Sequence, residues 1–271
     1  MKKEAKQASQ ANFTRVFSWA VIPTALLVAI AVFMFIMGDG SHFQGGNNAN
    51  APMPGDFYGT IYKGGFIVPV LMTLLLTVIT FTFERFIAIR RASGSGSTAE
   101  FLTKIKALIA KEQLPEAIAV CDKQGGSVAN VAKSAIDKYA LLKGDASLNK
   151  EQKVVALQKE IEEVTALELP ALEQNLVIIS TISTIATLLG LLGTVIGMIR
   201  AFAAMSAAGA PDSSALATGI SEALINTAFG IGTAALAIIF YNYFTTRIDK
   251  LTYSIDEVGF TIAQSYAANN K

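Results

Sequence analysis

The stretch LLGLLGTVIGMIRAF, residues 188–202, has the apolar composition of a membrane helix, yet it contains three glycines, Thr194 and Arg200. Glycine fills less space than any other residue, so this helix gives up much of its packing volume. In a bilayer, small residues let two helix backbones approach closely enough for dispersion and polar contacts to act. The stretch therefore predicts a membrane helix that packs against another helix rather than against lipid alone.

The composition of the whole chain agrees with a membrane protein. Of its 271 residues, 52% are hydrophobic and only 16% are charged, and its mean hydropathy is +0.46. Soluble domains carry about 25% charged residues. The net charge of +1 offers no basic surface for nucleic acid, so we expect no nucleic-acid partner.

The residue types that carry most enzyme and metal chemistry are scarce in this sequence. Cys121 is the single cysteine, which excludes an intrachain disulfide and a cysteine metal cluster. The single histidine, His42, follows a Gly-rich turn without acidic residues at ligand spacing, and we expect it to be a loop residue. The sequence contains no CxxC pair, phosphate-binding glycine loop or catalytic triad pattern. We expect no enzymatic activity, no metal and no cofactor.

Four segments are long and apolar enough to cross a bilayer, which takes about 20 helical residues. They are residues 17–37, 65–83, 176–206 and 217–246. A basic start followed by an apolar run could also be a cleaved signal peptide, but the first run exceeds the usual 7–15-residue core of such a peptide. We therefore expect a retained helix and an all-α membrane protein with four transmembrane helices.

The flanking Lys and Arg residues predict the orientation of these helices. Basic residues precede the first segment and follow the second and fourth, whereas the connection after the first has only Lys63 beside two aspartates. Because basic loops stay in the cytoplasm, we place residues 1–16, 84–175 and 247–271 there. The loop 38–64 and the turn 207–216 lie on the outer side.

The cytoplasmic stretch 84–175 carries the pattern of a helical domain. Residues 92–97, ASGSGS, have the composition of a flexible joint. Apolar residues then recur at helical spacing in short segments, with breaks at Pro115, at 124–126 and at 143–145. From Lys150 a charged helix leads into the third span, with a kink expected at Pro170. We expect two very long helices that extend from the membrane into the cytoplasm.

Small residues form a continuous line along the third span. Their positions alternate in steps of three and four, so they share one helix face: Ser180, Ser183, Thr187, Gly190, Thr194, Gly197, Ala201 and Ala204. The fourth span repeats the pattern with Ala223, Thr227, Gly230, Ala234, Ala237 and Tyr241. We expect Ser183, Thr187, Gly190, Gly197, Ala201 and Gly230 to line a pore, with plain helix packing as the alternative.

One acidic residue, Glu222, lies inside the fourth span. Charged groups at a bilayer centre cost at least about 2.5–3.5 kcal/mol on insertion scales, and they usually face a cavity or a partner. Thr194 and Thr227 both lie about 16 residues from Pro211, so they reach similar depth. Glu222 and Asn226 share one face near them. Burial favours the protonated acid, so we predict a proton pathway of Glu222, Thr194, Thr227 and Asn226.

Two structural alternatives remain open for the same residues. Arg200 and Glu222 are each about 11 residues from Pro211, so they could form an ion pair that keeps the carboxylate charged. Threonines in membrane helices also commonly bond back to their own backbone and do nothing more.

The two helices that carry these residues resemble a known family. GLLGTVIGMIRAF, followed by GISEALINTAFGIGTAALAIIFYN, is similar to the signature of the ExbB/TolQ/MotA proton-channel family, most closely its ExbB branch. The similarity covers about residues 180–245. It implies that Thr194, Glu222 and Thr227 occupy the positions of the family's two threonines and its glutamate.

The resemblance also implies an assembly and a role. ExbB-like proteins form a homopentamer in the inner membrane of Gram-negative bacteria, around a pore that holds the helices of an ExbD-like dimer. Proton flow energises a TonB-like protein that acts on outer-membrane transporters, with protons as the coupling ion and membrane lipids as neighbours. The implied outer side, with loop 38–64, is the periplasm. A TolQ-like or motility-stator subunit, or a scaffold without proton conduction, are the alternatives.

The sequence departs from the family pattern at two places. ExbB proteins commonly have three spans, so residues 17–37 form an extra N-terminal helix. Arg200 stands just after the glycine-threonine motif, where the family is not uniformly basic. This second departure leaves open whether Glu222 is free to carry protons or is tethered to Arg200.

Overall fold

The computed structural model describes residues 20–145, 147–207 and 213–269. Within them, four helices are long and apolar enough to cross a membrane. The predicted all-α membrane fold is therefore confirmed. The expected N-terminal segment 1–16 lies outside the described residues, as does most of the expected turn 207–216.

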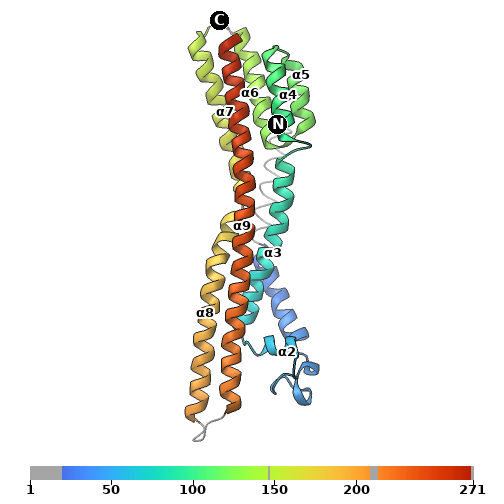
Figure 1. Ribbon diagram of the computed structural model, residues 1–271, viewed down its shortest axis with the longest axis vertical. Coiled ribbons are helices and arrows are strands. Elements are labelled where there is room, and N and C mark those ends of the chain that lie inside the picture. The colour runs from blue at the N-terminus through green and yellow to red at the C-terminus, as the bar shows by residue number, and fades with distance from the viewer. Residues whose placement is uncertain (1–19, 146, 208–212, 270–271) are drawn as a thin grey trace. The chain divides into compact units, whose positions relative to one another are not determined.

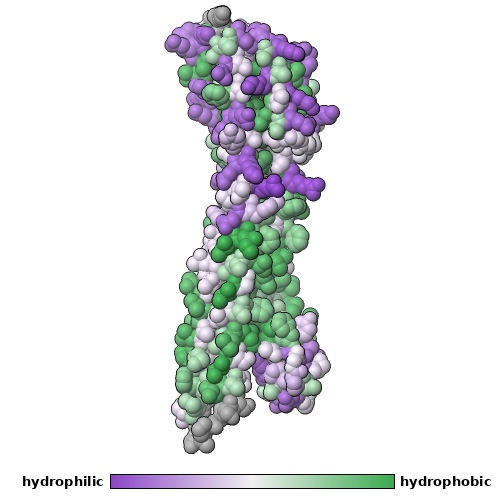
Figure 2. Space-filling model, viewed as in Figure 1, coloured by the Kyte–Doolittle hydropathy of each residue, from purple (hydrophilic) through white to green (hydrophobic). Residues whose placement is uncertain are grey.

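Internal contacts divide the chain into two compact units. The membrane unit contains the described residues of Met1–Phe83 and Val177–Tyr241, and the polar unit contains those of Glu84–Leu176 and Asn242–Lys271. Apolar side chains cover much of the visible surface of the membrane unit, whereas hydrophilic side chains dominate the polar unit (Figure 2). Exposed apolar side chains such as Leu224, which is 63% exposed, suit a lipid environment.

Long helices build the membrane unit. The first apolar helix covers Ala20–Met37 and ends in the π-helix η1 (Val32–Met37). Helices α3 (Ile67–Ala92), α8 (Leu176–Ala207) and α9 (Ser213–Asn269) follow. In Figure 1, α8 and the first part of α9 run side by side.

The connection 38–64 contains several short ordered elements. It contains the short 3₁₀ helices η2 (Gly40–His42) and η3 (Gln44–Gly46) and the helix α2 (Phe57–Tyr62). Phe43 is buried, and it forms the one isolated β-bridge of the described residues, with Pro52.

Asp56 organises this connection by capping α2. Its Oδ1 accepts a hydrogen bond from the Gly59 N–H at 2.7 Å, and its Oδ2 lies 2.8 Å from His42 Nδ1. The hydrogen bond from Gly59 and the contact with His42 hold the pKa of Asp56 below its usual range. His42 is the loop residue that the sequence predicts, although its carboxylate neighbour is 14 positions away and was not expected.

Four complete helices form the polar unit together with the ends of α3 and α9. They are α4 (Thr98–Ala110), α5 (Leu114–Gln124), α6 (Gly126–Gly144) and α7 (Lys150–Glu173). Helix α4 packs against α5, α5 against α6, and α6 against α7. The core is apolar, with Leu157 and Ile255 fully buried, and Tyr139 stacks edge to face on Tyr266 with their ring centroids 4.6 Å apart.

The helix ends of the polar unit follow local chemistry. Asn149 begins α7 with a capping box. The Asn149 side chain accepts a hydrogen bond from the Gln152 N–H, and the Gln152 side chain accepts one from the Asn149 N–H. The break expected at Pro115 is present, since α4 ends at Ala110 and Pro115 lies in the first turn of α5. A proline is tolerated there because the first N–H groups of a helix have no internal partner.

Two expectations about connections are corrected by the structure. Residues 92–97 form a hydrogen-bonded turn rather than a free joint, since the Ser95 N–H donates to Gln124 O at 2.7 Å and Ser95 Oγ to Lys123 O at 2.8 Å. The helix that starts at Lys150 was expected to continue into the third span, but it is interrupted at Gln174 and Asn175. The kink expected at Pro170 stays a prediction. Asn175 takes a left-handed backbone conformation with φ of 64°, which an α-helix cannot continue.

Candidate functional site

The contact between α8 and α9 explains the glycines of the third span. A methyl group at Gly197 would lie 2.8 Å from both Ala223 N and Gly219 O, and one at Gly190 would lie 3.1 Å from Gly230 Cα. Real Cβ atoms essentially never come closer than 3.0 Å to such neighbours. The two backbones therefore touch where the small residues of both helices face each other.

The small-residue face that sequence spacing predicts is mostly occupied by this contact. Gly190, Gly197, Ala201 and Gly230 are buried within the chain. Ser183 and Thr187 are half-buried, and both hydroxyls bond to carbonyls of their own helix; Ala204 has no described side chain. The pore-lining role of these residues stays a prediction.

The two threonines predicted to lie at equal depth are brought together. Thr194 Oγ1 and Thr227 Oγ1 are 3.1 Å apart, which is hydrogen-bonding distance across the α8–α9 contact. Both hydroxyls also reach backbone carbonyls, at 2.8 Å from Thr194 to Leu191 O and at 3.1 Å from Thr227 to Ala223 O. Each threonine therefore bonds to a carbonyl of its own helix and also contacts the other threonine.

Glu222 is buried and is paired with Arg200. Its side chain is only 7% exposed, and its Oε1 lies 2.6 Å from Arg200 Nη1, whose side chain is 49% exposed. The ion pair that spacing left open is thus the arrangement in the structure. The carboxyl end of this pair is therefore shielded, whereas the guanidinium end is accessible.

Asn226 lies on the same face of α9 and is fully buried. Its Nδ2 donates to the carbonyl of Gly64 at 2.9 Å. A methyl group at Gly193 would lie 2.4 Å from Asn226 Cβ, so this glycine makes the notch in α8 that receives the asparagine. The Asn226 Oδ1 atom has no hydrogen-bond partner among the described residues, so it can accept a hydrogen bond from a further group.

The turn before α3 completes the site, and sequence reasoning missed it. Gly65 has φ of 77°, and a methyl group there would lie 2.5 Å from Glu222 Oε1 and 3.3 Å from Arg200 Nη1. The Arg200 guanidinium also lies over the Phe66 ring, with Cζ 5.5 Å from the centroid. The sequence signal for this turn is the glycine pair at 64–65. A glycine pair does not indicate that Glu222 and Arg200, so distant along the chain, lie beside it.

Comparison with known families identifies the central part of the sequence. Residues 127–257 match the model of the MotA/TolQ/ExbB proton channel family. The central part of the chain is therefore similar to that proton channel family. The match contains both threonines, Arg200 and Glu222, whereas the first apolar helix and the turn before α3 lie outside it. No curated protein matches the chain.

The arrangement places one carboxyl group, that of Glu222, among hydrogen-bonding groups in fixed positions. The threonine hydroxyls and the Asn226 amide hold their positions through backbone contacts.

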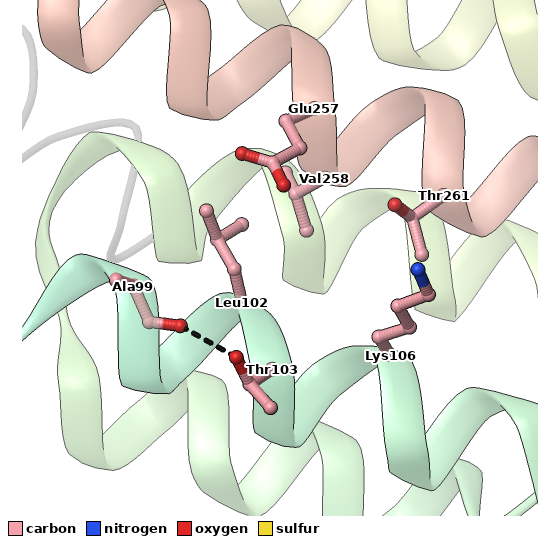
Figure 3. Close-up of a pocket in the computed structure, with 7 residues that line it drawn as sticks. All are labelled: Ala99, Leu102, Thr103, Lys106, Glu257, Val258 and Thr261. Carbon is pink, nitrogen blue, oxygen red and sulfur yellow. Dashed lines mark hydrogen bonds between the residues drawn. The ribbon is translucent and has the colours of Figure 1, made fainter.

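The polar unit contains a cavity of a different kind. It has a volume of about 370 Å³ and lies between α4 and α9, where Leu102 and Val258 face each other (Figure 3). Lys106 and Glu257 add opposite charges to its wall, and the Thr103 hydroxyl is occupied by Ala99 O at 3.0 Å. Among the described residues no group of three or more His, Cys, Asp or Glu side chains could hold a metal ion. None of the predicted site residues lies in this cavity.

Proposed function

We propose that this chain is an ExbB-like subunit of an inner-membrane motor driven by the proton motive force, with Glu222 as the proton-carrying group. The observation that carries this proposal is the buried carboxyl group inside a family membrane helix, next to a pair of hydrogen-bonded threonines. Intramembrane carboxylates in such surroundings commonly mark proton relays.

The ion pair supplies a two-state element for this motor. In one state Glu222 is ionised and holds Arg200 at 2.6 Å. In the other a proton neutralises the carboxyl group, and the half-exposed guanidinium is released. Each proton that crosses a potential of 100 mV yields about 2.3 kcal/mol. Several protons can therefore drive mechanical work on a partner, and no covalent bond in this chain needs to change.

The partners and location in this proposal follow from the family resemblance. The chain would form a homopentamer whose pore holds an ExbD-like dimer, which energises a TonB-like protein for transport across the outer membrane. Both termini would lie in the cytoplasm, and loop 38–64 in the periplasm. A TolQ-like or motility-stator subunit uses the same membrane chemistry on another load, and a bound one-span partner identified by pull-down would distinguish these branches.

Substitution of Glu222 tests the proton-carrying role. Glu222→Gln keeps the size of the side chain but removes the titrating group, so we expect loss of energy-dependent uptake at normal protein levels in the membrane. Glu222→Asp keeps the carboxyl group and should retain part of the activity. Full uptake by the glutamine variant would refute the proposal.

A second function, a structural scaffold, is favoured by the short contact between Glu222 and Arg200. Removing one partner of a buried ion pair destabilises a protein more than removing both, because one charge is left unpaired. A scaffold therefore predicts that Arg200→Gln with Glu222→Gln restores both assembly and uptake. The proton-carrying role predicts that the double variant assembles, as judged by native mass spectrometry, but stays inactive.

A further inference from the structure

We propose that the polar unit binds the headgroup of an anionic phospholipid in a cavity between the end of α3 and the adjoining part of α9. The cavity has a volume of about 260 Å³, just below the roughly 300–1,000 Å³ of typical ligand pockets. Its wall consists of two arginines among aromatic, aliphatic and small residues: Phe86, Ile89, Arg90, Ser93, Gly94, Tyr243, Phe244 and Arg247. This site is separate from the proton pathway and does not depend on the proposed function.

Two arginines supply the positive charge of the cavity. Arg90 and Arg247 are both exposed, and neither forms an ion pair with a carboxylate in the described part of the chain. Their neighbour Arg85 behaves differently: it is buried, pairs with Glu84 and donates to Leu172 O at 3.2 Å. The charge of Arg85 is thus used within the fold, whereas the charges of Arg90 and Arg247 remain available to a ligand.

The geometry favours a phosphate group as the ligand. A guanidinium presents a planar fork of donors that matches phosphate oxygens, and it stacks on aromatic rings. The Arg247 Cζ atom lies 5.4 Å from the centre of the Tyr243 ring, so this contact already orients the Arg247 guanidinium group. Backbone donors in the cavity are occupied, since the Ser93 and Gly94 N–H groups bond to Ile89 O and Arg91 O. Recognition therefore falls to the two arginines.

The surroundings indicate a lipid rather than a soluble phosphate. Arg90 follows the apolar run of α3 by seven residues, and Arg247 follows that of α9 by six. Two aromatic residues of the cavity wall, Phe86 and Tyr243, are 49% and 42% exposed beside the arginines. Basic residues at the end of membrane helices, combined with interfacial aromatic rings, are the usual setting for anionic headgroups. The acyl chains would cover the exposed aromatic faces.

Native mass spectrometry of the full-length protein can test this site. The protein would be reconstituted in nanodiscs that contain phosphatidylcholine and phosphatidylglycerol, and the lipids retained on release would be counted. The test variant is Arg90→Gln with Arg247→Gln. The matched control is Arg91→Gln with Lys250→Gln, which removes the same charge from exposed positions next to the cavity but outside its wall.

We expect the test variant to lose the preference for phosphatidylglycerol over phosphatidylcholine by at least about tenfold, because it removes charge-assisted guanidinium–phosphate hydrogen bonds that the control keeps. The control should keep it within about twofold. An equal loss in both variants would show nonspecific surface charge and overturn the proposal, as would no loss in the test variant. Displacement of phosphatidylglycerol from the wild-type chain by inorganic phosphate would also overturn it, because the site would then serve a soluble anion.

Discussion

Replacing Gly230 by alanine would test how far the α8–α9 contact determines the candidate site. A methyl group at Gly230 would lie 2.6 Å from Ala186 O and 2.8 Å from Gly190 Cα. Ordinary van der Waals contact begins near 3.4 Å, so the two backbones must separate by about 0.8 Å. Both obstacles are backbone atoms, which cannot rotate away as the end of a flexible side chain can.

This separation reaches the threonine pair, because Thr227 precedes Gly230 by less than one helical turn. The Thr194 Oγ1 to Thr227 Oγ1 distance of 3.1 Å would increase to about 3.9 Å, beyond the range of an O–H···O hydrogen bond. Overpacking costs roughly 1–3 kcal/mol and an interhelical hydrogen bond in a membrane about 0.6 kcal/mol. We expect Gly230→Ala to lower the free energy of unfolding by about 2–3 kcal/mol relative to its control.

The control is Gly232→Ala, two residues further along the same helix, where a methyl group would have nothing within 4 Å. Alanine favours a helix over glycine by about 1 kcal/mol at both positions, so this contribution cancels. Thermal unfolding of both variants in detergent, followed by circular dichroism, measures the difference. If Gly230→Ala and Gly232→Ala unfold at the same temperature, the close contact does not carry the energy that the structure assigns to it.

Three further predictions follow from the geometry. Gly65→Ala would place a methyl group 2.5 Å from Glu222 Oε1, so we expect lower energy-dependent uptake than for Gly46→Ala, which has a similar backbone conformation but no neighbour within 4 Å; equal uptake would contradict a role for Gly65. Leu157→Ala in the polar unit removes a fully buried side chain and should cost about 2–5 kcal/mol in denaturant unfolding, while Leu167→Ala, at a position 78% exposed on the same helix, should cost little. Burial, followed by the charge of Asp122, raises the pKa of Cys121 to about 12, so its reactive thiolate becomes abundant only as the pH approaches that value. Iodoacetamide should therefore label the folded chain at pH 9 far more slowly than the denatured chain, and equal rates would disprove this.

The candidate site divides into residues that spacing could find and residues that it could not. Thr194 and Thr227 are in contact because both are a similar number of residues from the turn, and a helix converts residue number into depth at a constant rise. The same count of residues from Pro211 indicated that Arg200 and Glu222 could form an ion pair, and the structure contains this pair. Local periodicity therefore placed these side chains correctly along the helix axis.

The connections show where local patterns fail. Composition predicted a free joint at 92–97, yet Ser95 bonds to Lys123, 28 positions further along the chain. Loop 38–64 is ordered by a contact between its own residues His42 and Asp56. Pro170 is the obvious candidate for a helix break, but Gln174 and Asn175 form it. Composition describes which conformations a segment tolerates, whereas the segments that fold against it select one of them.

The sequence by itself determined the class of this protein: four apolar spans, their small-residue faces, one carboxyl group in the membrane and the family motif around it. These features depend on helical periodicity and on the cost of polar groups in lipid, both of which act locally. Only the tertiary structure decided that Gly65 and Phe66 adjoin Glu222 and Arg200, and that Gly193 receives Asn226. Such contacts depend on which helices pack together and at what distance, and no short stretch of the chain contains that information.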